Sequence, residues 1–79
     1  MGLEGELRKE TEKWAGRIEK EMKKAKPRDQ ESERFLSNIR AYIKDSKYFL
    51  EKGDLVRGFE AIVWAWAWLQ ILKETGFLE

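Results

Sequence analysis

The hydrophobic positions fall into three segments with helical spacing, and a helix-ending residue follows each segment. In the first, apolar side chains recur every three, four or seven residues, at Leu3, Leu7, Trp14, Ile18, Met22 and Ala25. At about 100° per residue these positions form a narrow stripe along one helix. The residue before a proline avoids the α region, so Lys26-Pro27 ends the stripe. The pattern predicts a helix over residues 3–25.

The second segment predicts a helix over residues 30–52. Asp29 is a suitable N-cap, with Ser32 as the rival cap. The apolar stripe of this segment contains Phe35, Leu36, Ile39, Tyr42, Ile43, Ser46, Phe49 and Leu50. Gly53 suits the left-handed position that follows a helix, and Asp54 can cap the next helix at once. A connection this short requires the two helices to run antiparallel.

A third helix is expected over residues 55–75, with Gly76 as its stop. One face holds Leu55, Phe59, Ile62, Val63, Trp66 and Leu69, and Ala61, Ala65 and Leu72 widen it to roughly 200°. A helix with so wide an apolar face contacts two neighbours. The chain is therefore expected to be all-α: a single-domain three-helix up-down-up bundle over residues 1–79, with the third helix at its centre.

The third helix also carries tryptophans at positions 64, 66 and 68. Helical geometry places Trp66 with the core residues. Trp64 and Trp68 share a different face, which Ile71 extends and which points nearly opposite Trp66. Two interpretations remain open: the neighbouring helices cover Trp64 or Trp68 as well, or the face of Trp64, Trp68 and Ile71 is an exposed partner-binding surface. The expected partner is a second copy in a homodimer, or another protein.

Composition excludes several kinds of chemistry. The 79 residues include no Cys and no His. Disulfides, thiolate metal sites and every catalytic arrangement that uses imidazole are therefore excluded. No glycine-rich phosphate-binding loop is present. Acidic residues such as Glu10, Asp45 and Glu60 lie among compensating cations. We therefore expect a protein that is not an enzyme and that holds no metal and no cofactor.

The charge pattern bears on partners. Lys and Arg number 16 against 15 Asp and Glu, and the signs are mixed along the chain. Such a mixture is typical of a solvated surface rather than of a nucleic-acid or membrane surface. One basic cluster stands out at the end of the first helix, formed by Lys20, Lys23, Lys24, Lys26 and Arg28. Cations favour a helix C-terminus through the helix dipole. The alternative function is contact with RNA or DNA phosphates.

The expected location is the cytoplasm. The first ten residues mix charges and lack an apolar core, unlike a signal peptide. The apolar run over residues 61–72 is too short to span a bilayer, so no membrane contact is expected. Glu and Lys are abundant whereas Asn and Gln are scarce, a balance typical of thermophile proteins.

Residues 42–72 carry a more specific pattern. It consists of a Tyr-x-x-Asp-x-x-x-Phe stretch, a Lys-Gly-Asp turn and a helix that places aromatic-Ala before Trp-Leu. The matching residues are Tyr42, Asp45, Phe49, Lys52, Gly53, Asp54, Trp64, Ala65, Trp68 and Leu69. This pattern resembles the DUF357 family of short archaeal proteins, from which Ala67 and Gln70 depart where the family has Gly and Asp.

The resemblance implies a small helical bundle from an archaeon, with no assigned activity. It implies a packing role for Trp68 and leaves Trp64 as the candidate for an interface. Because Gln70 replaces an acid, the departure argues against acid chemistry at that position.

Overall fold

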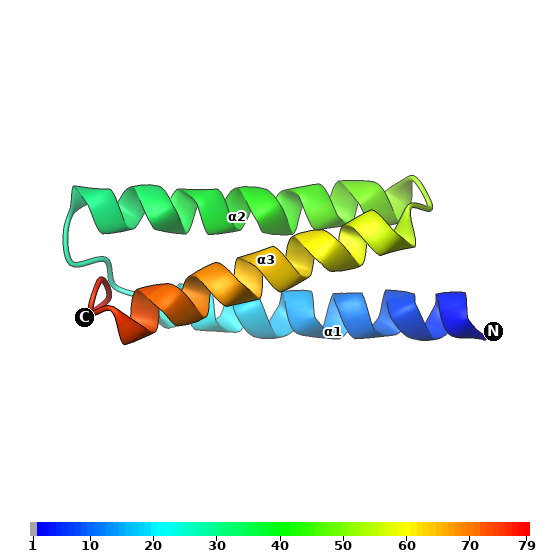
Figure 1. Ribbon diagram of the computed structural model, residues 1–79, viewed down its shortest axis with the longest axis horizontal. Coiled ribbons are helices and arrows are strands. Elements are labelled where there is room, and N and C mark those ends of the chain that lie inside the picture. The colour runs from blue at the N-terminus through cyan, green and yellow to red at the C-terminus, as the bar shows by residue number, and fades with distance from the viewer. Residues whose placement is uncertain (1) are drawn as a thin grey trace.

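Three helices make up most of the protein. The computed structural model describes residues 2–79, with the helices α1 (Leu3–Lys24), α2 (Gln30–Glu51) and α3 (Leu55–Glu74). They run up, down and up along a rod of 43 × 17 × 16 Å (Figure 1). This is the all-α three-helix bundle that the pattern predicts. Each expected range extends one residue further, to the C-cap residues Ala25, Lys52 and Thr75.

Side chains at two N-caps set where α2 and α3 begin. The Asp29 carboxylate accepts hydrogen bonds of 2.8 Å from both the backbone N–H and the hydroxyl of Ser32. Asp29 is therefore the N-cap of α2, and Ser32 is its donor. The carboxylate of Asp54 accepts from the N–H of Arg57 at 3.2 Å. Gly53, with φ at 80°, provides the left-handed residue between the two helices.

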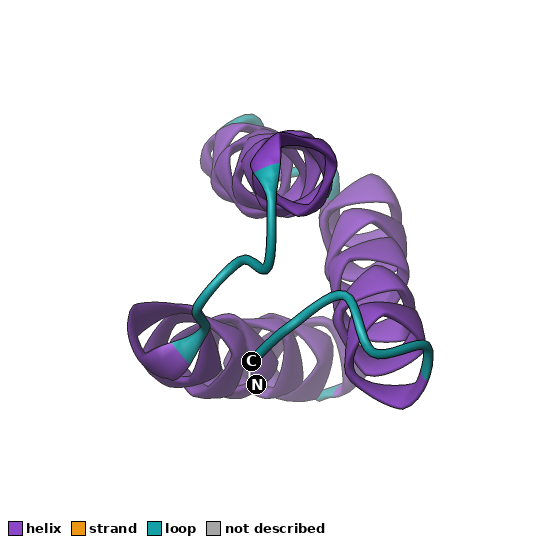
Figure 2. Cartoon of the chain, turned by 90° about the vertical axis from the view of Figure 1, so that its left-hand side faces the viewer, coloured by secondary structure: helices purple, strands orange, loops and turns teal. Residues whose placement is uncertain are grey.

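The third helix lies between the other two. α3 packs along both α1 and α2, whereas α1 and α2 contact each other only slightly (Figure 2). The close packing of α2 and α3 depends on Gly58, because a Cβ there would lie 2.8 Å from a methyl carbon of Leu50. At the same point the Ser46 hydroxyl donates a buried 2.7 Å hydrogen bond to the Gly58 carbonyl.

The core consists mainly of large aliphatic residues, with two alanines among them. Its buried members are Ala15, Ile18, Leu36, Ile39, Ile43, Ile62, Ala65, Leu69 and Leu72. Two residues expected on inner faces are exposed instead, Leu3 at 81% and Val63 at 49%. The buried side of α1 instead includes the small residues Thr11 and Ala15, and that of α3 includes Gly58, Ala61 and Ala65. Each buried face is therefore rotated toward its small residues, and Leu3 and Val63 fall outside it.

The C-terminal tail closes one end of the bundle. Leu78 forms an isolated antiparallel bridge with Pro27. On either side of it, the Arg28 N–H donates to the Phe77 carbonyl at 3.1 Å, and the Glu79 N–H donates to the Lys26 carbonyl at 2.8 Å. The helical pattern of the sequence gives no signal for this contact, because it joins two segments without regular secondary structure.

Candidate functional site

The most prominent surface feature lies on the side of α3 that faces away from the bundle. We define its outer face as Val56, Val63, Trp64, Ala67 and Ile71. Four of these residues are exposed: Val56 at 69%, Trp64 at 52%, Val63 at 49% and Ile71 at 46%. By helical position, Glu60 and Glu74 are the charged residues within this face, and the exposed Arg57, seven residues before Trp64, lies at its edge. The outer face is therefore a continuous apolar strip with carboxylates at two points.

α3 is apolar around most of its circumference, yet it is covered on only part of it. Ordinarily a helix of this kind is buried on all sides. Here 33% of the most apolar stretch of α3 is buried. By length and composition alone α3 could also cross a membrane, a property shared by the core helices of soluble bundles. Ile62, Leu69 and Leu72 pack fully into the core, so α3 is a core helix with one side uncovered.

The structure separates the three residues that the sequence assigns to a partner-binding face. Trp64 and Ile71 lie on the outer face and are exposed. Trp68 is half-buried and stacks on Phe35 of α2, with ring centroids 5.9 Å apart and an interplanar angle of 17°. The two residues thus differ in burial: Trp68 is covered by α2, whereas Trp64 is 52% exposed. Trp68 forms the edge of the exposed surface.

An aromatic notch adjoins the outer face on the α1 side. Its lining is apolar throughout, with a volume of 240 Å³, and comprises Trp14, Phe59, Ile62, Val63 and Trp66. The Trp14 and Trp66 rings meet edge to face, with centroids 5.0 Å apart. Val63 belongs to both the notch and the outer face, so the two form one apolar surface. The helical pattern of the sequence gives no signal for the notch, because it exists only where α1 and α3 meet.

The basic residues at the end of α1 do not form one patch. All five, Lys20, Lys23, Lys24, Lys26 and Arg28, are exposed. Arg28, however, holds the C-terminal tail: it donates to the Gly76 carbonyl at 3.0 Å and lies 5.0 Å from the centre of the Phe77 ring. It also pairs with Asp29 at 3.5 Å. Its guanidinium is therefore engaged within the protein.

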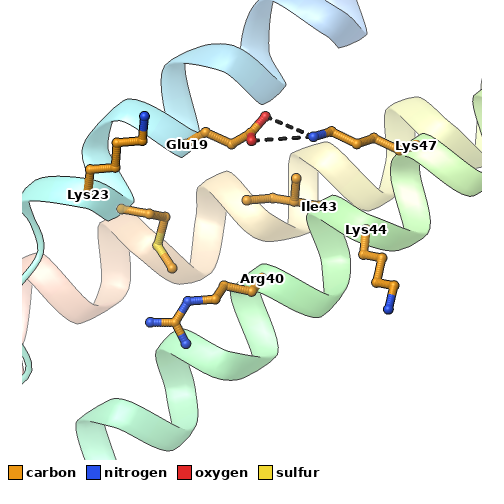
Figure 3. A pocket seen from close by; sticks show the side chains of 7 residues that line it. Glu19, Lys23, Arg40, Ile43, Lys44 and Lys47 are labelled. Atoms are coloured by element: carbon orange, nitrogen blue, oxygen red, sulfur yellow. Dashed lines mark hydrogen bonds and ion pairs between the residues drawn. The ribbon is translucent and has the colours of Figure 1, made fainter.

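Lys23 instead lies along a groove between α1 and α2, which forms because these helices barely touch (Figure 3). The groove has a volume of 510 Å³ and is lined by Glu19, Met22, Lys23, Arg40, Ile43, Lys44 and Lys47. Lys47 pairs with Glu19 at 3.2 Å and Arg40 with Glu33 at 3.1 Å. Figure 3 shows the Lys23 and Lys44 ammonium groups pointing in different directions, so the cations do not converge on one point.

Two acidic residues, Glu21 and Asp29, have a lowered pKa, and both have structural roles. The hydrogen bond from Lys73, at 3.0 Å, lowers the pKa of Glu21 and ties α3 to α1. The backbone N–H of Ser32 lowers the pKa of Asp29 at the start of α2. Within residues 2–79, no three Asp or Glu side chains are grouped so that they could hold a metal ion. Both perturbed carboxylates therefore serve helix ends or helix pairing.

Fold and surface together define the class of protein: a small all-α bundle whose central helix is covered on two sides and apolar on the third. The chain belongs to the DUF357 family, since the family model described as "Protein of unknown function (DUF357)" matches residues 9–78. The match extends the resemblance seen over residues 42–72 to nearly the whole chain, including most of α1.

A solved structure of the same family has a similar fold. The crystal structure of protein AF1782 from Archaeoglobus fulgidus shares 59% sequence identity with this chain. The alignment covers 99% of this chain and 97% of that one, with a TM-score of 0.87. No curated protein matches the sequence.

Proposed function

We propose that this protein is a non-enzymatic interaction module that self-associates through the outer face of α3. Trp64 and Ile71 form the centre of the contact, and the edge of Trp68 borders it. The observation that carries the proposal is the 52% exposure of Trp64 within an apolar strip on an otherwise charged molecule. Large exposed apolar patches on small soluble proteins mark interaction sites, and tryptophan is enriched among the residues that dominate binding.

The distribution of charge supports the same surface. Charged residues make up 39% of the chain. Over the length of α3, by contrast, the outward side offers three charged residues, Arg57 at its edge, Glu60 and Glu74. Depletion of charge at the centre, with charged residues around it, is typical of protein–protein interfaces. Burying this strip against another protein removes apolar area from water, which stabilises the complex by about 25 cal/mol per Å².

The test compares two exposed aromatic residues. Trp64→Glu places a charge in the outer face and is expected to abolish association while leaving helicity nearly intact, because the side chain is half outside the fold. Tyr48→Glu is the matched control: Tyr48 is 55% exposed but lies on α2, away from the outer face. Molar mass and circular dichroism are measured for both variants. Loss of folding in W64E, or unchanged association, contradicts the proposal.

A second candidate function is RNA binding, and one observation favours it. The groove between α1 and α2 adds Arg40, Lys44 and Lys47 to Lys23, so cations from two helices line it. Affinity for RNA is then expected to fall steeply with salt and to weaken in a Lys23→Glu, Lys44→Glu double variant. W64E serves as the control that retains this binding. Affinity that is absent, or independent of salt, removes this candidate.

A further inference from the structure

Building on the proposed self-association, we infer that two copies pack α3 against α3 in antiparallel orientation, about a two-fold axis beside Val63 and Trp64. The partner is thus a second copy of this chain, and its register is specified. In this register residue i of one copy lies opposite residue 127 − i of the other. Val56 then faces Ile71 of the second copy, and the two Trp64 rings lie together at the axis.

The two carboxylates of the outward side decide the orientation. A parallel pair would place each residue beside the same residue of the second copy. Glu74 would then face a second Glu74, and Glu60 would lie beside a second Glu60. Like charges brought together at an interface disfavour the complex. In the antiparallel register Glu60 lies opposite Ala67. Glu74 lies opposite Gly53, one turn from the exposed Arg57 of the second α3, whose charge is opposite.

The same charges fix the centre of the contact. The outward stripe runs along α3 through positions 56, 60, 63, 67 and 71. The axis of a symmetric contact must therefore lie on this stripe. An axis at Ala67 would bring Glu60 opposite Glu74. An axis between Val63 and Trp64 avoids this pair and lies close to the middle of α3, which spans Leu55–Glu74 and so overlaps its copy almost fully.

The aromatic notch supports this position of the axis. Its α3 residues run from Phe59 to Trp66, on either side of Val63. A second α3 centred at Val63 and Trp64 therefore covers the notch together with the outer face. Ala67, whose side chain is small, lets the two helices approach closely on the other side of the axis. The contact thus covers the exposed apolar surface on both sides of Val63.

Disulfide cross-linking tests the register, because the protein contains no cysteine and an introduced thiol is unique. Glu60→Cys and Ala67→Cys are made separately and oxidised alone and as an equimolar mixture. Ala41→Cys, at an exposed position on α2, reports random collision. The antiparallel register brings the E60C and A67C thiols together across the interface. In A67C alone, the two thiols are seven residues out of register, about 10 Å, too far for a disulfide.

The mixed E60C–A67C disulfide is expected to make up well over half of the cross-linked dimers, the share that random pairing gives. A67C alone is expected to cross-link no faster than A41C. Faster cross-linking of A67C alone would mean a parallel pair or an antiparallel pair with its axis at Ala67. Either result would overturn the register while leaving self-association intact. Cross-linking equal to that of A41C in a chain of dimeric mass would place the contact on another surface and overturn both proposals. A monomeric mass at all concentrations would overturn the proposed function itself.

Discussion

Gly58 marks the point where α3 approaches α2 most closely. An added methyl group there would meet Leu50 at 2.8 Å and the Ser46 carbonyl oxygen at 3.3 Å, whereas at Gly16 on α1 it would meet nothing within 4 Å. Both glycines lie within helices, so alanine removes about the same backbone penalty at each, about 1 kcal/mol. The two sites therefore differ in packing alone.

We expect Gly16→Ala to raise the free energy of unfolding by up to about 1 kcal/mol. Gly58→Ala is expected to lower it, because overpacking costs about 1–3 kcal/mol and exceeds the gain in helix propensity. Chemical denaturation of both variants measures the difference. Equal stabilisation by the two substitutions would mean that α2 and α3 are not held together at Gly58.

Asp29 gives a pH dependence with a defined sign. Hydrogen bonds from Ser32 lower the pKa of this carboxyl below its ordinary value. Its stabilising contribution is therefore fully present above the ordinary aspartate pKa, and is lost as the pH falls from that value through the lower folded pKa. Asp29→Asn retains a capping side chain without this titration. Thermal unfolding should show wild type losing more stability than D29N on acidification, and parallel acid profiles would refute this role.

At this scale the sequence predicts local features well and burial less well. The roles of Asp29, Gly53 and Asp54 follow from their neighbours in the chain, because a cap or a left-handed turn is decided within a few residues. Whether Leu3 and Val63 are buried depends on where a second helix lies. That position is set by small residues, which carry little hydrophobic signal of their own.

The element that distinguishes this molecule is α3, because one of its apolar sides packs in the core and the other is exposed. Neighbouring residues show the contrast: Leu72 is 1% exposed in the core, whereas Ile71 is 46% exposed on the outer face. Trp64 and Trp66 repeat it, since Trp66 meets Trp14 and Trp64 faces outward. One apolar side of α3 is thus buried within the chain, and the other apolar side is exposed on the surface.

Alanine substitutions at the two neighbouring positions separate these uses. In a W64E background, in which association does not contribute, Leu72→Ala should lower the free energy of unfolding by about 2–5 kcal/mol because it leaves a cavity. Ile71→Ala should change it by no more than about 0.5 kcal/mol, as for other surface sites. Urea denaturation provides both values. A large loss in I71A would place Ile71 in the core and remove it from the proposed interface.

The division of α3 into two faces could be predicted in outline from helical geometry alone. Trp64 and Ile71 were placed on a common face away from the core by their spacing, and the structure places both there. The stacking of Trp68 on Phe35 depends on the position of α2. The spacing of residues within α3 cannot predict that position. The notch beside Trp14 and the groove beside Lys23 likewise require two helices in register.

At the scale of the whole molecule, packing around α3 holds the bundle together. The ion pairs that connect helices, Lys47 with Glu19 and Lys73 with Glu21, involve partly exposed side chains, and such pairs contribute little. A chain of 79 residues also has a small core, so covering more apolar surface has a large effect on its stability. A second copy packed on the outer face would supply that cover.

Molar mass in solution tests the central claim most directly. Sedimentation of the wild-type chain from micromolar to millimolar concentration should show the mass rising from 9.4 kDa to twice that value. The account predicts this dimer, and predicts that W64E removes it while Y48E does not. A mass of 9.4 kDa at every concentration would contradict the account, because the outer face of α3 would then remain in water without a second copy to cover it.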